Sequence, residues 1–203
     1  MRAVKKLLLA LTVVSTYLMV VFALSPLSLS FDNRSQDSLQ GDEIAITPFL
    51  KPQWVSYDSH SNNLSFTYPI NAKVDDNGKT IYLTQWGADQ KPNQKFSDGI
   101  ALKITQKMSL TGNFEDDAKA VRQAIVNSAI DMPLDISSIY KTDINGKSVY
   151  QFTVKGLEER RFTIMPVSFD QYVEIIDGSA DSGSNAYKRA ADTIVASITK
   201  NEQ

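Results

Sequence analysis

The sequence predicts an α+β fold: an antiparallel sheet of about six to seven strands, flanked by two helices as an α-β-α sandwich and preceded by an N-terminal transmembrane helix. Three observations predict it. Segments of alternating apolar and polar residues are joined by short turns that contain Asn and Gly, which favours antiparallel hairpins. Two other segments repeat apolar residues at helical spacing, so each has one face to bury. An uncharged apolar run lies close to the N-terminus.

Residues 1–24 are predicted to be a signal anchor. The apolar run from Leu7 to Leu24 would span about 27 Å as a helix, close to the ~30 Å hydrocarbon core of a bilayer. Basic residues before it (Arg2, Lys5 and Lys6) hold the N-terminus in the cytoplasm, so the rest of the chain is extracytoplasmic, either periplasmic or extracellular. Because the apolar region of a cleaved signal is usually shorter, a single-pass membrane anchor is favoured. Cleavage before Phe31, with secretion, is the alternative.

Residues 25–56 are rich in Ser, Asp, Asn, Gln and Pro without a sustained period, and they are predicted to form a polar stalk. Apolar residues near its end, such as Trp54, could dock on the domain as an extended segment. The folded domain is assigned to residues 57–203. Its first two strands are expected at 64–69 and 79–86, joined as a hairpin through the Asp- and Gly-containing turn at 75–78.

The first helix of the domain is predicted to begin at Asn113, whose side chain can cap it. Acidic residues 115–117 suit the positive end of the helix dipole. Apolar residues then recur at helical spacing for about four turns: Phe114, Ala118, Val121, Ile125 and Ala129. The last helix has an apolar stripe from Tyr187 to Ile198 and is expected to end near Lys200.

The remaining strands are recognised by alternation and by their turns. The Asn145-Gly146 pair is the strongest short hairpin signal in the chain. The strands are expected at 99–108, 136–143, 149–154, 160–167 and 171–176.

Composition excludes several classes of function. The apolar share of 42% and the charged share of 22% are those of a globular protein. Beyond the N-terminal segment, 18 basic residues face 23 acidic ones, a net charge of about −5, and no basic stripe is present, so nucleic acid is not an expected partner. The absence of cysteine excludes disulfides and thiolate chemistry. No cofactor is expected, because glycine-rich phosphate loops are missing.

Few residues of the sequence are candidates for catalysis or metal binding. His60 is the only histidine and lies in a polar segment typical of a solvated loop. The run from Glu158 to Arg161 is typical of a solvated turn. Of three acidic clusters, the loop 177–183 is the least unsuitable for calcium, because Asp177, Asp181 and several backbone oxygens share one short segment, although its spacing is not that of an EF-hand. No catalytic residue is assigned.

The order of these segments resembles a known family. An opening LSFTYP strand (64–69) is followed by an acid-started helix, an INGK turn (144–147) that leads into VYQFTV (149–154), an Arg-bearing strand, a Tyr172-Val173 strand and a closing helix. This layout, over about residues 56–200, resembles the PsbP-like domain, also seen in relatives of the bacterial protein DcrB. The resemblance implies an α-β-α sandwich that works as a non-catalytic assembly or binding module.

The sequence therefore predicts a membrane-tethered, extracytoplasmic binding or assembly module that is not an enzyme. Its expected partner is a protein at or near the membrane, because the tether confines the domain there. Two alternatives stay open: a hydrolase whose site is spread over loops, and a domain that binds a small ligand or Ca²⁺.

Overall fold

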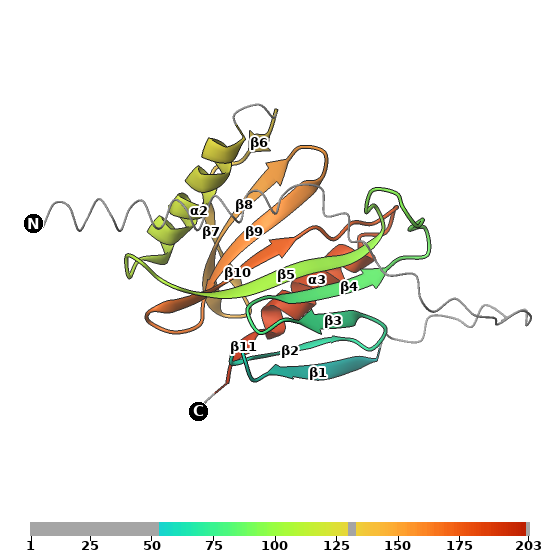
Figure 1. The fold of residues 1–203 in the computed structure, drawn as a ribbon, viewed down its shortest axis with the longest axis horizontal. Helices are drawn as coiled ribbons and strands as arrows, with labels where there is room; N and C mark the ends of the chain where they lie inside the picture. The colour runs from blue at the N-terminus through green and yellow to red at the C-terminus, as the bar shows by residue number, and fades with distance from the viewer. Residues whose placement is uncertain (1–52, 130–132, 202–203) are drawn as a thin grey trace, which may run out of the picture.

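Two antiparallel sheets are present in the computed structural model of the chain, which describes residues 53–129 and 133–201 (Figure 1). The larger has eight strands in the order β3-β4-β5-β10-β9-β8-β6, with β7 also paired to β8. The smaller has the order β1-β2-β11. The strands are β1 (Trp54–Ser59), β2 (Leu64–Pro69), β3 (Lys73–Asp76), β4 (Ile81–Trp86), β5 (Gly99–Met108), β6 (Asp135–Ile136), β7 (Tyr140–Ile144), β8 (Lys147–Lys155), β9 (Glu159–Pro166), β10 (Gln171–Asp177) and β11 (Thr199–Lys200).

Two helices cover opposite faces of the larger sheet. The helix α2 (Phe114–Ser128) packs on β8 and β9, and α3 (Ala186–Ser197) packs on β5 and on β2 of the smaller sheet. Strand alternation divides the core accordingly, because neighbours such as Ile164 and Met165 on β9 enter different clusters. The predicted antiparallel sheet between two helices is thus confirmed. The strands are more numerous than expected, eleven among the described residues.

The local signals at the ends of several elements are confirmed. Asn113 caps α2, since its side-chain oxygen accepts a hydrogen bond from the backbone N–H of Glu115 at 3.0 Å. Asn145 and Gly146 both have positive φ, 52° and 75°, as the two-residue turn between β7 and β8 requires. Short local interactions were therefore well predicted.

The predicted hairpin of 64–69 with 79–86 is wrong. The turn at 75–78 joins β3 to β4, whereas β2 pairs with β1 on one side and with β11 on the other. The turn was located correctly, but the short strand that enters it, β3, has only four residues and a weak pattern. Sequence proximity therefore suggested the wrong partner for β2.

Two further boundaries differ from the prediction. The single strand expected at 136–143 is divided into β6 and β7. The backbone N–H of Ser137 still donates to the carbonyl of Thr153, but the N–H of Thr153 donates to the Ser137 hydroxyl and not to its carbonyl, so the ladder ends there. The last helix ends at Ser197 and not near Lys200, because Ile198 has an extended backbone (φ −63°, ψ 126°) and leads into β11.

The predicted anchor at residues 1–24 and most of the predicted stalk lie outside the described residues. The end of the predicted stalk is described. Residues 54–56 are the first three residues of β1 and therefore belong to the smaller sheet. In the described part of the chain, no helix is both long and apolar enough to cross a membrane.

A cluster of polar side chains joins the smaller sheet to β3. The carboxylate of Asp76 accepts hydrogen bonds from the hydroxyl of Ser59 (2.5 Å), the amide of Asn62 (3.0 Å), the hydroxyl of Tyr57 (3.2 Å) and the backbone N–H of Gly78 (2.8 Å). Burial opposes the charged carboxylate, but these hydrogen bonds outweigh it and lower the pKa of Asp76 below its ordinary value. The ionised form therefore stabilises the junction of the sheets.

We expect Asp76→Asn to lower the free energy of unfolding at pH 7 by about 1–2 kcal/mol, because an amide cannot accept all four hydrogen bonds. A lowered pKa means that the contribution is complete above the unfolded-state value of about 3.9 and is lost as pH falls through the folded-state value. Urea unfolding of both proteins from pH 7 to pH 3 should therefore show the difference shrinking toward acid. Asp75→Asn, on the exposed neighbour, is the control. A difference that stays constant with pH would contradict this role of the carboxylate.

Candidate functional site

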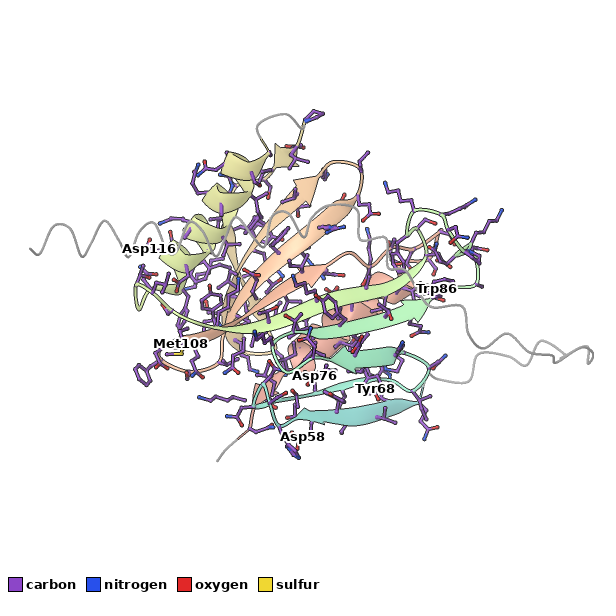
Figure 2. All side chains as sticks on the ribbon, in the orientation of Figure 1. Asp58, Tyr68, Asp76, Trp86, Met108 and Asp116 are labelled. Carbon is purple, nitrogen blue, oxygen red and sulfur yellow. The ribbon has the colours of Figure 1, made fainter. Side chains whose placement is uncertain are left out.

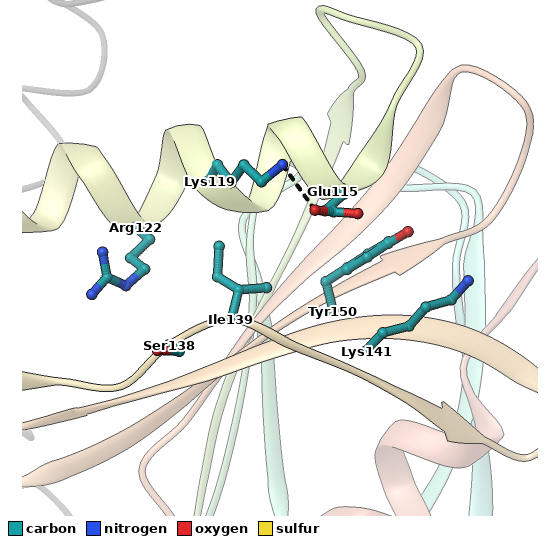
Figure 3. Close-up of a pocket in the computed structure, with 7 residues that line it drawn as sticks. All are labelled: Glu115, Lys119, Arg122, Ser138, Ile139, Lys141 and Tyr150. Atoms are coloured by element: carbon teal, nitrogen blue, oxygen red, sulfur yellow. Dashed lines mark ion pairs between the residues drawn. The ribbon is translucent and has the colours of Figure 1, made fainter.

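A groove with a volume of about 440 Å³ lies between α2 and the β7–β8 hairpin (Figure 3). Charged side chains of α2 form one wall, and the segment before β7 and the two strands form the other. The residues that line it are Glu115, Lys119, Arg122, Ser138, Ile139, Lys141 and Tyr150.

The helical wall follows from the spacing of the residues on α2. Glu115, Lys119 and Arg122 are four and three residues apart and so lie on one side of the helix. The apolar side of the same helix is buried on Phe152 and Phe162, whose rings are stacked with centroids 4.9 Å apart. Packing of the apolar side sets the direction in which the charged side points.

The opposite wall follows from the register of the hairpin. The turn at Asn145-Gly146 pairs Lys141 with Tyr150 across the two strands. The ammonium nitrogen of Lys141 lies 5.9 Å from the centre of the Tyr150 ring, within the range of a cation–π contact. Figure 3 shows Tyr150 and Ile139 below Glu115 and Lys119, so the floor of the groove is partly apolar.

The three cations of the groove differ in how far they are neutralised. Lys119 forms ion pairs with Glu115 (2.8 Å) and Asp116 (3.2 Å), and these hydrogen-bonded carboxylates raise its pKa. Lys141 has no carboxylate within ion-pair distance among the described residues. The positive charge that is open to a ligand therefore comes mainly from Lys141 and from Arg122.

Arg122 also organises the groove. Its Nε donates to the carbonyl of Ser137 at 2.8 Å and its Nη2 donates to the carbonyl of Ile136 at 3.2 Å. These bonds tie the end of β6 to α2 and use two of the five N–H groups of a guanidinium. The remaining N–H groups can donate to a carboxylate or a phosphate. An aromatic ring, an aliphatic floor and two available cations suit an anionic group attached to an apolar one.

A second group of cations lies on the same face of the sheet, on the other side of α2, but it is more strongly neutralised. Lys107 forms an ion pair with the buried carboxylate of Glu174 at 2.7 Å. Burial lowers the pKa of Lys103, and the charges of Lys107 and Arg160 lower it further against the opposing effect of Glu174. The groove is therefore the better candidate site for an anionic ligand.

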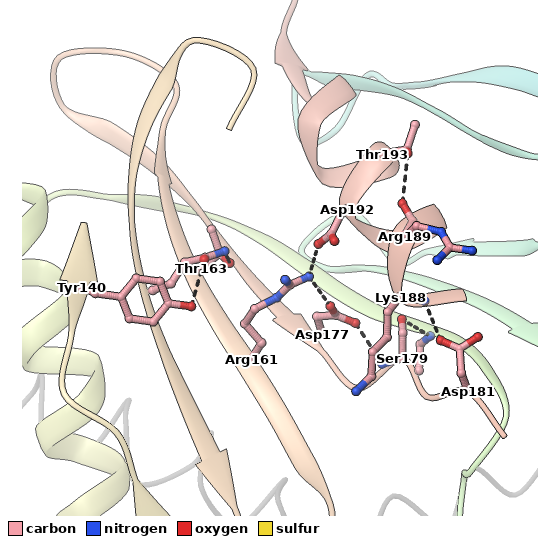
Figure 4. Close-up of polar contacts among 12 residues, drawn as sticks. Tyr140, Arg161, Thr163, Asp177, Ser179, Asp181, Lys188, Arg189, Asp192 and Thr193 are labelled. Carbon is pink, nitrogen blue, oxygen red and sulfur yellow. Dashed lines mark hydrogen bonds and ion pairs between the residues drawn. The ribbon is translucent and has the colours of Figure 1, made fainter. Parts of the chain in front are cut away.

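The two predicted calcium ligands, Asp177 and Asp181, are engaged with different partners (Figure 4). The carboxylate of Asp177 accepts from Arg161 (2.7 Å) and from the backbone N–H of Ser179 (2.8 Å). That of Asp181 accepts from the backbone N–H groups of Tyr187 and Lys188 at 2.8 and 3.0 Å. Asp181 thereby caps α3, whose own N-cap residue forms no side-chain bond. Among the described residues no group of three or more His, Cys, Asp or Glu side chains converges on one point.

Arg161 and His60 were both expected to be solvated, and the structure places only His60 in an exposed turn. Arg161 was expected in a solvated turn, but it lies on β9 and bridges Asp177 of β10 to Asp192 of α3. Its side chain therefore fastens α3 to the sheet. His60 lies in the exposed turn between β1 and β2, with its Nδ1 3.6 Å from a carboxylate oxygen of Asp58, as a solvated loop histidine was expected to be.

Sequence reasoning missed every residue of the groove. One signal was present: a two-residue turn at 145–146 implies that Lys141 lies opposite Tyr150. The other wall had no such signal, because no local pattern says which helix will lie beside that strand pair.

A scan against models of protein families gave no match, and a search of curated proteins found no relative. Solved structures do match. The PsbP protein of the cyanobacterium Synechocystis sp. PCC 6803 (CyanoP) aligns with a TM-score of 0.51 and 11% identity, over 81% of this chain and 98% of that one. LpqN of Mycobacterium tuberculosis, described as involved in cell envelope biogenesis, aligns with a TM-score of 0.45 and 12% identity, over 75% of this chain and 93% of that one. The chain therefore has the PsbP-like fold that the order of its segments predicted.

Proposed function

We propose that this chain is a membrane-tethered, extracytoplasmic and non-catalytic binding module, and that the groove beside α2 is where it holds an acidic segment of a protein partner. The basic cluster and the apolar run of residues 1–24 support the tether and the compartment. The PsbP-like fold supports an accessory rather than a catalytic role, since the family that the sequence resembles consists of non-catalytic assembly or binding modules.

The observation that carries the proposal is the chemistry of the groove. Lys141 and Arg122 approach it from opposite walls, beside the Tyr150 ring and the Ile139 side chain. Cations that lack a carboxylate partner in a concave site favour an anionic ligand, and the aromatic wall favours an apolar neighbour to that anion. A peptide that carries glutamate next to an aromatic residue meets both requirements.

The test is the affinity of the full chain in detergent for a short peptide with alternating Glu and Phe residues, measured by calorimetry. We expect Lys141→Glu to weaken binding about tenfold, a change of about 1.4 kcal/mol, because the variant places a carboxylate where the ligand carboxylate must lie. Binding should also weaken as salt is raised from 50 to 300 mM.

Lys79→Glu is the matched control, because it makes the same change of charge at an exposed turn outside the groove. It should bind the peptide as the wild-type chain does. Equal weakening in both variants would mean that only net charge matters and would contradict a site in the groove. No binding of the peptide by the wild-type chain would contradict the assignment of an acidic ligand.

A further inference from the structure

Three large apolar side chains are displayed on two adjoining loops at one end of the domain. Met108 is 54% exposed, Leu110 is 66% exposed and Phe169 is 87% exposed. Met108 ends β5 and Leu110 follows it, while Phe169 lies in the turn between β9 and β10. The loops adjoin because Met108 pairs with Gln171 and the backbone N–H of Ser109 donates to the carbonyl of Asp170 at 2.7 Å. We call these three residues the apolar tip.

Hydrogen bonds hold the loop of Leu110 in one conformation. The hydroxyl of Ser109 donates to the buried carboxylate of Asp117 at 2.5 Å, and the backbone N–H of Leu110 donates to the same carboxylate at 3.3 Å. The hydroxyl of Ser109 also accepts from the backbone N–H of Gly112 at 2.9 Å. Asp117 belongs to α2, so the loop is fastened to the first turn of that helix.

The turn that carries Phe169 is fastened in the same way. The backbone N–H groups of Val167 and Ser168 both donate to the carbonyl of Gln171, at 3.0 and 3.2 Å. The side chain of Gln171 reaches the sulfur of Met108 at 3.3 Å and accepts from the amide of Gln106 at 3.0 Å. The apolar tip is therefore presented by ordered loops, which lowers the conformational entropy that binding would cost.

The charges near the apolar tip are acidic. Asp116 and Asp117 lie in the first turn of α2, and Asp170 adjoins Phe169. Two lysines of the neighbouring elements are already in ion pairs, Lys119 with Glu115 and Asp116, and Lys107 with Glu174. A second copy of this surface, or a bilayer of anionic lipids, would bring like charges together.

The position of the apolar tip is also informative. Figure 2 shows Met108 and Asp116 at one end of the domain, and Tyr68 and Trp86 toward the other. Val55 pairs with Tyr68, so the chain enters the domain from the side of Tyr68. The apolar tip consequently lies away from the start of β1.

We infer that the apolar tip is a docking surface for a protein partner that offers an apolar pocket rimmed by Lys or Arg. Phe169 is the anchor residue, because a rigid and exposed aromatic side chain gains the most from entering such a pocket. Leu110 and Met108 cover its flanks, and Asp116 and Asp170 meet the basic rim. This surface is distinct from the groove and does not depend on the function proposed for it.

The test is photo-crosslinking of the full chain in the cells that naturally make it, with p-benzoylphenylalanine in place of Phe169. We expect one adduct with another protein, joined at an apolar segment that has Lys or Arg beside it. Leu157 is the matched control position, because it is 88% exposed in the turn between β8 and β9 and is not part of the apolar tip. The adduct should be absent when the crosslinker replaces Leu157.

Two further variants test whether formation of the adduct depends on the other residues of this surface. Leu110→Ser should reduce the yield at least fivefold, and Asp116→Asn should reduce it about twofold. The melting temperature of each purified variant should equal that of the wild-type chain, which separates loss of docking from loss of folding. An adduct with a second copy of the chain, an adduct with lipid, equal yields at the two positions, or an undiminished yield in Leu110→Ser would each overturn the inference.

Discussion

Replacing Phe152 by alanine is expected to lower the free energy of unfolding by about 3–5 kcal/mol. The side chain is fully buried and stacks on Phe162, with the two rings 4.9 Å apart and inclined by only 4°. Truncation would leave a cavity directly under α2, because Ala118, Val121 and Ile125 of that helix belong to the same cluster. Urea unfolding followed by circular dichroism measures the change.

Phe169→Ala is the matched control for this prediction. The chemical change is the same, but Phe169 is 87% exposed, so its loss should change the free energy of unfolding by less than about 0.5 kcal/mol. Because α2 forms one wall of the groove, Phe152→Ala should also weaken binding of the acidic peptide. A loss of less than about 1 kcal/mol in Phe152→Ala would mean that α2 does not depend on this cluster.

Gly99→Ala is expected to be the second most damaging substitution, with a loss of about 2–5 kcal/mol. Gly99 has a φ of +134°, which a residue with a Cβ rarely adopts. An added Cβ would lie 2.1 Å from the carbonyl oxygen of Gln85, so the first residue of β5 would have to move away from β4. That movement would disturb its hydrogen bonds with Ala180, which are 2.8 and 3.0 Å long.

Gly112→Ala separates the cost of a positive φ from the cost of the close contact with Gln85. Gly112 also has a positive φ, +72°, but an added Cβ would meet nothing within 4 Å. Only the backbone strain remains there, and we expect a loss of about 1–2 kcal/mol. Chemical denaturation of the two variants side by side should show the larger loss at Gly99. Equal losses would show that the approach of Gln85 is relieved at little cost.

The predictions that succeeded rest on interactions between near neighbours in the sequence. Asn113 caps α2 through a residue two positions away, and the Asn145-Gly146 turn closes a hairpin whose strands follow each other directly. The helical stripe of α2 packs as its spacing indicated. Local chemistry of this kind operates whatever the rest of the chain does.

Several of the predictions that failed depended on partners far along the chain. Strand β2 is completed by β11, where Ser65 pairs with Thr199 across 134 positions. A strand of two residues such as β11 is too short to have a sequence pattern that predicts this pairing. The same reason explains Arg161, whose two carboxylate partners come from β10 and α3.

The α+β class, the two helices, the N-cap of α2 and most strand positions could thus be read from residue order, because periodicity and turn chemistry act over a few residues. The residue order likewise places Lys141 opposite Tyr150. Tertiary packing alone decided that α2 lies beside that pair to form the groove, and that the loops of Leu110 and Phe169 adjoin at one end. Both sites are made by segments that meet only when the sheet is assembled, and burial of distant apolar faces, not any local preference, brings them together.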